Sequence, residues 1–243
     1  MSNTGNENYI NWKHWDAEKF AAVVPGARFY FDQIFKNKSI PDQCNILELG
    51  YGNGELLGYF RSLGHKVIGV EINAHLVERA INAGYEAYQA PIGEATALQH
   101  KQFDLIVAID VAEHMSFVEL NELFSWAGRH LNKGGKLILR FPEGASPFGL
   151  AYQHGDFTHV TSLTKGKIVA LCYSNNLQLE SYEDEVLRSN KLCAYGLFGK
   201  LILRTLQLYA STVRWSMRIL FYPLAIDLKL STNSIAVIAT TET

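Results

Sequence analysis

The stretch Glu48–Gly54 (ELGYGNG) decides the fold of this chain. A short apolar run, Asn45–Leu49, ends in this stretch. The residues from Asn53 to Leu63 have the apolar spacing of a helix. Three glycines alternate with other residues in the stretch, and their lack of a Cβ lets the backbone approach a ligand closely and point free N–H groups at it. The pattern therefore predicts a strand, a ligand-binding loop and a helix.

The alternation of strand and helix continues along the chain. Two helices are expected within residues 12–35, broken at Pro25-Gly26. Further strands are predicted at 66–70, 86–89, 103–109, 136–141, 177–182 and 234–240, and further helices at 74–82, 117–131 and 164–173. Seven strands separated by helices predict an α/β protein with a doubly wound, Rossmann-like, mostly parallel sheet and helices on both faces. Ligands of such sheets bind beyond the carboxyl ends of the strands.

Composition narrows the possible classes of protein. Of the 243 residues, 48% are hydrophobic, which is enough to form a sizeable core, and the formal net charge of -2 gives no reason to expect nucleic-acid binding. The three cysteines lack metal-type or redox-type spacing, which favours reduced thiols. The first residues lack the order of a signal peptide, and no segment has the length and apolar content of a spanning helix. We therefore expect a cytoplasmic protein.

The spacing of the glycines also narrows the ligand. It is Gly-x-Gly-x-Gly, whereas the dinucleotide fingerprint is Gly-x-Gly-x-x-Gly, so a nicotinamide cofactor is disfavoured. Beyond the loop, Glu71 ends the second predicted strand, where a carboxylate can accept hydrogen bonds from both hydroxyls of a ribose. This combination fits an adenosine.

Three later segments, Phe103–Ile106, Asp110–His114 and Leu131–Gly135, complete a series of motifs. Together with the glycine loop and Glu71, they resemble the successive motifs of class I S-adenosylmethionine-dependent methyltransferases over about residues 44–184. The resemblance implies S-adenosylmethionine as cofactor and S-adenosylhomocysteine as product. The residues that it implies at the cofactor are Glu48, Gly50, Gly52, Gly54, Glu71, Ile72, Asp110 and His114.

The resemblance also implies separate roles for these residues. The glycines border the methionine part of the cofactor, Glu71 holds the ribose, Ile72 packs on the adenine and the Asp110 region meets the methionine end. Many relatives carry an acid after the third strand that meets the adenine amine, and this chain has none there. Backbone groups, Gln89 and Glu94 remain as alternatives for adenine recognition.

The loop after the fifth strand carries the candidate catalytic residues. Its sequence Asp156-Phe157-Thr158-His159 resembles a segment of methyltransferases found among bacterial surface-polysaccharide and glycolipid functions, in which the histidine usually faces the acceptor pocket. This implies His159 as a base that takes the proton of an acceptor hydroxyl, with Asp156 or His154 orienting it. A structural role for His159 stays open. Because the histidines and acids lack a ligand spacing, no metal site is expected.

A long insert separates the sixth and seventh predicted strands, where related enzymes often have a short hairpin. Between residues 186 and 232, one acid, Asp227, stands against seven cations: Arg188, Lys191, Lys200, Arg204, Arg214, Arg218 and Lys229. Cations recur at helical spacing between 196 and 222, beside a broad apolar surface. This predicts a basic amphipathic helix suited to an anionic membrane surface. Packing over the acceptor pocket and a homodimer contact are the alternatives.

We therefore expect a single methyltransferase domain in four parts: an N-terminal helical cap (1–42), a cofactor-binding core (44–184), the basic insert (186–232) and a final strand (233–240). Its expected activity is methyl transfer to an acceptor hydroxyl, on a sugar of a bacterial glycan or glycolipid at the inner face of the membrane. A quinone-type or other small-molecule O-methyltransferase is the alternative enzyme. A non-catalytic module that keeps the cofactor fold is the second alternative, and a nicotinamide enzyme is the third.

Overall fold

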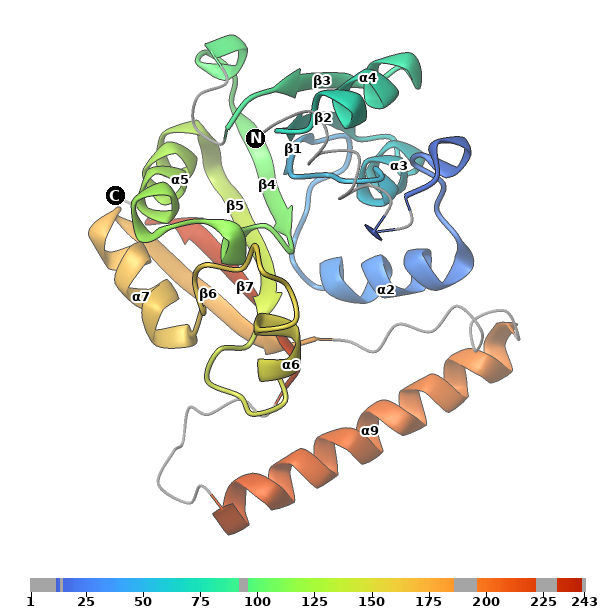
Figure 1. Ribbon diagram of the computed structural model, residues 1–243, viewed down its shortest axis with the longest axis vertical. Coiled ribbons are helices and arrows are strands. Elements are labelled where there is room, and N and C mark those ends of the chain that lie inside the picture. Colours follow the sequence, from blue (N-terminus) through green and yellow to red (C-terminus); the bar gives the residue numbers. More distant parts are fainter. Residues whose placement is uncertain (1–11, 14, 92–95, 186–195, 222–230, 242–243) are drawn as a thin grey trace.

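The computed structural model describes residues 12–13, 15–91, 96–185, 196–221 and 231–241. Within these ranges seven strands form one sheet in the order β3-β2-β1-β4-β5-β7-β6 (Figure 1). The strands are β1 (Asn45–Leu49), β2 (Lys66–Glu71), β3 (Glu86–Gln89), β4 (Phe103–Ile109), β5 (Leu131–Pro142), β6 (Leu177–Asp184) and β7 (Asn233–Thr240). Only β7 runs antiparallel to its neighbours, β5 and β6. The predicted fold class is confirmed.

Helices connect the strands and begin at residues suited to that position. The α-helices are α2 (Pro25–Phe35), α3 (Glu55–Ser62), α4 (Ala74–Asn82), α5 (Phe117–His130), α6 (Leu150–Gln153), α7 (Lys165–Ser174) and α9 (Gly196–Phe221). Three short 3-10 helices are η1 (Ala17–Lys19), η2 (Thr96–Leu98) and η3 (Ala112–His114). Ser116 and Glu119 form a capping box at the start of α5, and the side chain of Thr164 caps α7. These caps satisfy N–H groups that a helix leaves unpaired.

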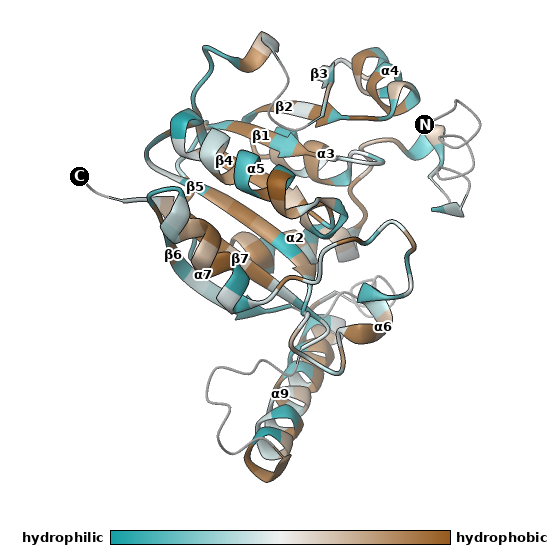
Figure 2. Ribbon diagram, turned by 60° about the vertical axis from the view of Figure 1, so that its left-hand side comes forward, coloured by the Kyte–Doolittle hydropathy of each residue, from teal (hydrophilic) through white to brown (hydrophobic). Residues whose placement is uncertain are grey.

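Helices cover both faces of the sheet because successive side chains of each strand point to opposite sides. Leu47 and Leu49 of β1 belong to the core cluster that includes α5 and α7. Ile46, directly before Leu47, packs in the cluster formed with α2 and α3. Figure 2 shows the central strands as predominantly apolar, which fits a sheet buried on both sides.

The structure differs from the sequence-based prediction in two connections. Residues 12–35 were expected to form two helices, but the described residues of this region form the short η1 and then α2, which begins at Pro25 because proline fits the first turn of a helix. In addition, β5 starts at Leu131, directly after α5, and not at Lys136. Its pairing with β4 shifts between Phe103 and Leu105, so the strand accommodates the glycine pair 134–135 as an irregularity.

Helix α9 lies outside the layers of helices that cover the sheet, below α2 in Figure 1. Only Gly199 and Leu203 of its 26 residues are buried, and Leu203 packs against Phe29 of α2. The predicted helix at 196–222 therefore exists as Gly196–Phe221, while residue 222 and the cations Arg188, Lys191 and Lys229 lie outside the described residues. So do Glu94 and most of the N-terminal cap before residue 15. Within the described ranges no helix, α9 included, has the length and apolar content to cross a membrane.

Candidate functional site

The glycine loop joins β1 to α3 in a conformation that side chains rarely adopt. The φ angles of Gly50, Gly52 and Gly54 are +64°, +52° and +74°, in the left-handed region that favours glycine. The amide of Gly50 donates to the carbonyl of Val70 at 2.7 Å, which fixes the loop against β2. The sequence-based prediction of a strand, a sharp loop and a helix at this place is confirmed.

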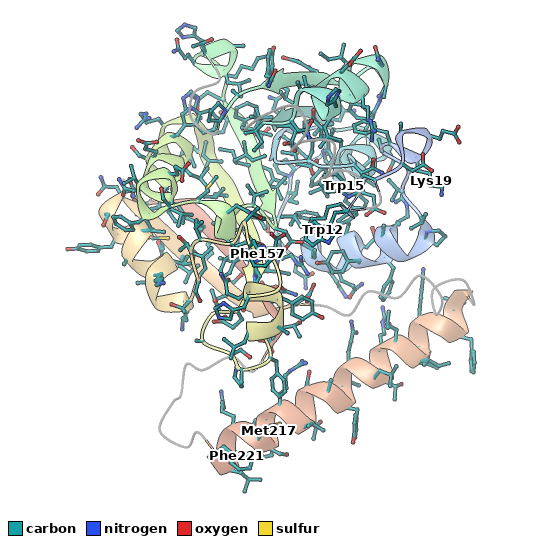
Figure 3. All side chains as sticks on the ribbon, in the orientation of Figure 1. Trp12, Trp15, Lys19, Phe157, Met217 and Phe221 are labelled. Carbon is teal, nitrogen blue, oxygen red and sulfur yellow. The ribbon has the colours of Figure 1, made fainter. Side chains whose placement is uncertain are left out.

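Aromatic side chains of the N-terminal segment lie over the loop. A Cβ built on Gly52 would lie 2.8 Å from the ring of Trp15, and one on Gly54 would lie 2.7 Å from Phe20. On the other side, a Cβ on Gly50 would lie 2.5 Å from a methyl of Val111. The loop is therefore closely packed between the segment before α2, where Figure 3 labels Trp15, and the residues that follow β4.

Two buried carboxylates stand beside the loop. Glu71, at the end of β2, accepts hydrogen bonds from the amides of Gly52 (3.3 Å), Ile72 (2.8 Å) and Asn73 (3.1 Å). Burial raises the pKa of Glu71, although these bonds oppose the rise. Glu48 is 4% exposed, its Oε2 has no hydrogen-bond partner, and burial together with the charge of Glu71 raises its pKa well above the usual range. Both residues are thus held where a polar ligand would meet them.

The residues predicted to meet the adenine lie beyond β2. Ile72 is 62% exposed, which leaves its side chain available for an aromatic ring. Gln89, at the end of the neighbouring β3, donates from Nε2 to the carbonyl of Ile72 at 3.2 Å. Glu94 cannot be compared because it lies outside the described residues. The exposed Ile72 is compatible with an adenine contact, which stays a prediction.

Asp110 follows β4 with a φ of +56° and has a partner that sequence reasoning missed. Arg140 of β5 pairs with Asp110 and also with Glu185, after β6. Burial disfavours the charge on Arg140, but the two carboxylates outweigh it and raise its pKa. The ion pair fixes the carboxyl end of β4 to that of β5. No spacing along the chain could indicate it, because it connects residues from three separate segments.

Three residues from two loops meet next to this point, and we name them the histidine cluster: Glu113, His114 and His159. The rings of the two histidines lie edge to face with centroids 4.6 Å apart, and Nε2 of His159 lies 3.8 Å from Oε1 of Glu113. Glu113 is 1% exposed, and burial, followed by the charge of Asp110, raises its pKa to about 8. Burial also lowers the pKa of His114, and His159 contributes to that change. The prediction placed His114 and His159 near the reacting groups but did not join them to Glu113.

The two predicted orienting residues differ in their position. Oδ2 of Asp156 lies 3.9 Å from Nε2 of His159 and 3.5 Å from Nζ of Lys13, so Asp156 borders the cluster. Its pKa is lowered because hydrogen bonds from Thr158 outweigh the effect of burial. His154 is exposed at the end of α6, and no contact between its side chain and His159 occurs among the described residues. Asp156 is therefore the candidate orienting residue that the geometry supports.

Comparisons with known proteins show which family the sequence matches. Residues 17–182 match a family described as methyltransferase domain. A ubiquinone biosynthesis O-methyltransferase of Chelativorans sp. (strain BNC1) is 34% identical over 80 residues, which cover 31% of this chain and 32% of that protein. The chain thus aligns with only about a third of the length of this relative.

Solved structures show the same fold at low identity. A SAM-dependent methyltransferase from Archaeoglobus fulgidus superposes with a TM-score of 0.60 at 18% identity, covering 88% of this chain and 94% of that one. A TehB-like SAM-dependent methyltransferase from Corynebacterium glutamicum gives a TM-score of 0.58 at 16% identity, covering 99% and 100%. The chain belongs to the methyltransferase domain family and has the class I fold of S-adenosylmethionine-dependent methyltransferases.

Proposed function

We propose that this protein transfers the methyl group of S-adenosylmethionine to a hydroxyl of its acceptor. The observation that carries the proposal is the position of the histidine cluster beside the glycine loop. Val111, which packs against Gly50, is followed two and three residues later by Glu113 and His114. Groups able to accept a proton therefore stand at the carboxyl end of β4, next to the loop expected to hold the methyl donor.

The cofactor side of the site supplies binding and alignment. Glu71 would accept hydrogen bonds from the ribose hydroxyls, while the positive-φ glycines would allow the methionine part of the cofactor to lie against the backbone. The positively charged sulfonium suits a place near Glu48 and Asp110. Because the sulfonium already carries a good leaving group, alignment of the reacting atoms is the main contribution, up to about 7–11 kcal/mol.

The acceptor side would remove a proton. An aliphatic hydroxyl keeps its proton at neutral pH, so a nearby group must take it as the new bond forms, which contributes about 10²–10⁴-fold in rate. His159 is the candidate for this step. Its Nδ1 lies 3.1 Å from the carbonyl of Gln153, which can only accept, so Nδ1 carries the hydrogen and Nε2 has the free lone pair. Asp156, near Nε2, would stabilise the protonated ring.

For the acceptor itself we propose a sugar of a bacterial glycan or glycolipid at a membrane surface, and helix α9 supports the membrane location. On a helical wheel, its cations Lys200, Arg204, Arg214 and Arg218 share one side. Arg214 and Arg218 are half-buried on the side nearest the protein. The remaining, wider side presents exposed apolar residues: Leu197, Phe198, Leu201, Leu208, Tyr209, Trp215, Ile219 and Leu220. A helix that lies at a membrane interface places its apolar side in the lipid and its cations among the anionic headgroups, and the sides of α9 are arranged in this way.

Charge favours an anionic membrane over a second copy of the chain as the occupant of this surface. Residues 196–221 contain four cations and no acid. A symmetric dimer through α9 would bring two such sets together and repel, whereas anionic headgroups attract them, at about 1 kcal/mol per cation. Met217 and Phe221 extend the apolar end of the helix (Figure 3). A lipid-linked acceptor would then reach the site from the membrane surface.

A vesicle flotation assay tests the membrane contact. We expect the protein to float with phosphatidylglycerol vesicles at low salt, and less at high salt. Lys200→Gln with Arg204→Gln removes two cations and should weaken binding by about 30-fold, which corresponds to about 2 kcal/mol. Lys66→Gln with Lys133→Gln removes the same charge at exposed positions where β2 starts and near the start of β5, and should change little. Failure to float, or a dimer that α9 variants dissociate, would contradict the membrane contact.

A transfer assay tests the activity. Cofactor labelled in the methyl group is incubated with lipid extracts, with polysaccharide extracts and with a phenolic quinone precursor. We expect label in a lipid or polysaccharide fraction, bound as an ether that survives mild base. A Glu71→Ala variant, which lacks the proposed ribose ligand, serves as control. Label in the phenol alone would favour the quinone-type alternative, which the name of the Chelativorans relative suggests, and label as a base-labile ester would contradict transfer to a hydroxyl.

A further inference from the structure

The histidine cluster has the composition and spacing of a metal site. Glu113, His114 and His159 each offer one ligand atom, and these atoms all lie within 4.8 Å of one another. Backbone bonds fix the two loops that carry them, because the carbonyl of Glu113 accepts from the amides of Val160 (2.9 Å) and Thr161 (3.0 Å). The side chains therefore meet through a rigid connection between the residues after β4 and those before α7.

Both imidazoles are oriented as metal ligands are. The Nδ1 of His114 lies 3.2 Å from the carbonyl of Thr158 and 2.9 Å from its hydroxyl, which itself donates to Asp156. The Nδ1 of His159 lies 3.1 Å from the carbonyl of Gln153. Because these partners accept hydrogens, both Nδ1 atoms carry one, and both Nε2 atoms keep a lone pair. A second ring nitrogen bonded to a carbonyl is the usual support of a metal-binding histidine.

Glu113 provides an independent observation. Its carboxylate is almost fully buried, yet Oε2 has no hydrogen-bond partner. A buried polar atom without a partner destabilises the fold, and more so when it is charged. A cation bound between Glu113 and the two Nε2 atoms would supply this partner.

We propose that Glu113, His114 and His159 bind one divalent transition-metal ion, and that the acceptor oxygen binds to the same ion. Two imidazole nitrogens and one carboxylate oxygen suit Zn²⁺, Co²⁺, Mn²⁺ or Fe²⁺, and three protein ligands leave a position for a substrate oxygen. Ligand atoms around such an ion lie about 3–3.5 Å apart, so small side-chain rotations would close the site. A metal site could not be expected from residue spacing, because His159 lies 45 residues beyond His114.

This inference rests on the proposed function and changes how the hydroxyl would be activated. An oxygen bound to a divalent cation loses its proton more readily, as bound water does. The O–H bond would break with the proton leaving to solvent. The oxygen would then form a bond to the methyl carbon while the carbon–sulfur bond breaks and its electron pair stays on sulfur. His159 would hold the metal in this mechanism, and it would not take the proton itself.

Direct metal binding tests the proposal without any acceptor. Untagged full-length protein is treated with a chelator, dialysed and titrated with Co²⁺ and Zn²⁺ by calorimetry, with the visible absorption of Co²⁺ as a second measurement. We expect one ion per chain. Glu113→Gln and His159→Gln should each weaken binding at least 10-fold while keeping affinity for S-adenosylhomocysteine, which shows that the variants fold. His100→Ala, which changes an exposed histidine outside the cluster, should bind the metal as the unmodified chain does.

The outcomes separate this proposal from the proposed function. No binding, or binding that survives both cluster variants but is lost in His100→Ala, would overturn the metal site. Transfer to a hydroxyl at full rate after chelator treatment would overturn it as well, and would leave the proposed function intact with His159 as base. Metal binding that depends on the cluster, without methyl transfer to any hydroxyl, would support the site and contradict the function.

Discussion

The two sides of the candidate site are built in different ways. The cofactor side consists of one contiguous loop and one strand end, and its polar groups are mainly backbone amides held by positive-φ glycines and by Glu71. The acceptor side is built from the side chains of the histidine cluster, which come from two loops 45 residues apart. The first side can therefore be specified by a short motif. The second depends on how the loops after β4 and β5 pack together.

Replacement of His159 should have the largest effect of these changes, and it should reduce methyl transfer without changing cofactor affinity. We expect His159→Ala to reduce methyl transfer by about 10²–10⁴-fold, because either a base or a metal ligand is lost. Affinity for S-adenosylhomocysteine should stay within about twofold, since no described contact joins His159 to the glycine loop. Turnover is measured with labelled cofactor and affinity by calorimetry, with His100→Ala as control. Unchanged turnover would remove His159 from the mechanism.

A change in the glycine loop should act on the cofactor side of the site and reduce cofactor affinity. Gly52→Ala places a Cβ 2.8 Å from the Trp15 ring at a φ of +52°, so we expect a loss of cofactor affinity of about 10–100-fold. Gly64→Ala has a similar φ of +85° but no atom within 4 Å of its Cβ. This control should cost about 1 kcal/mol of folding stability and leave cofactor affinity unchanged. Equal losses of affinity in both variants would mean that backbone strain alone explains the effect.

The smallest expected effect concerns the buried Glu48. Because burial and the charge of Glu71 raise the pKa of Glu48 in the folded protein, its contribution to stability is complete below the ordinary glutamate pKa of 4.5 and is lost as pH rises through the raised value. Glu48→Gln removes this titration. Without cofactor, the variant should gain stability relative to the unmodified chain as the pH rises from about 5 to about 8.

Urea denaturation at both pH values measures this difference. A parallel pH dependence for the two proteins would mean that Glu48 titrates normally. Cofactor affinity is the second measurement. If the Glu48 carboxylate contacts the ligand and destabilises the protein without it, replacing this carboxylate should weaken cofactor binding. A variant that is more stable at pH 8 and binds S-adenosylhomocysteine less tightly would show that the buried charge exists for the ligand.

The sequence predicted the sheet well because its signals are local. The β-branched run from Phe103 to Ile109 and the caps at Ser116 and Thr164 act within a few residues, and each element appears within a residue or two of its predicted place. The predicted secondary structure was wrong where a segment packs against residues that are distant in the sequence. An apolar spacing before Pro25 indicated a helix, but residues 15–24 contain only the short η1, and the aromatic rings of Trp15 and Phe20 pack on the glycine loop.

Residues with distant partners could not be predicted from the chain alone. Arg140 shows no motif, and its ion pairs with Asp110 and Glu185 depend on β4, β5 and β6 ending at the same edge of the sheet. Glu113 and His159 could each be noted in the sequence, but only the packing of their two loops brings the side chains together. By contrast, the amphipathic character of α9 follows directly from its helical spacing, whereas the side that faces the protein is decided by the packing of Leu203 against Phe29.

The sequence by itself determined the order of strands and helices, the position of the glycine loop and the carboxylate of Glu71, because backbone conformation and apolar periodicity are short-range properties. The tertiary structure decided the composition of the acceptor side. Hydrogen bonds from Val160 and Thr161 to Glu113 bring His159 next to His114, and burial changes the pKa of the groups that meet there. The distances between these side chains and their burial arise only when the chain folds, so no pattern in the linear sequence predicts them.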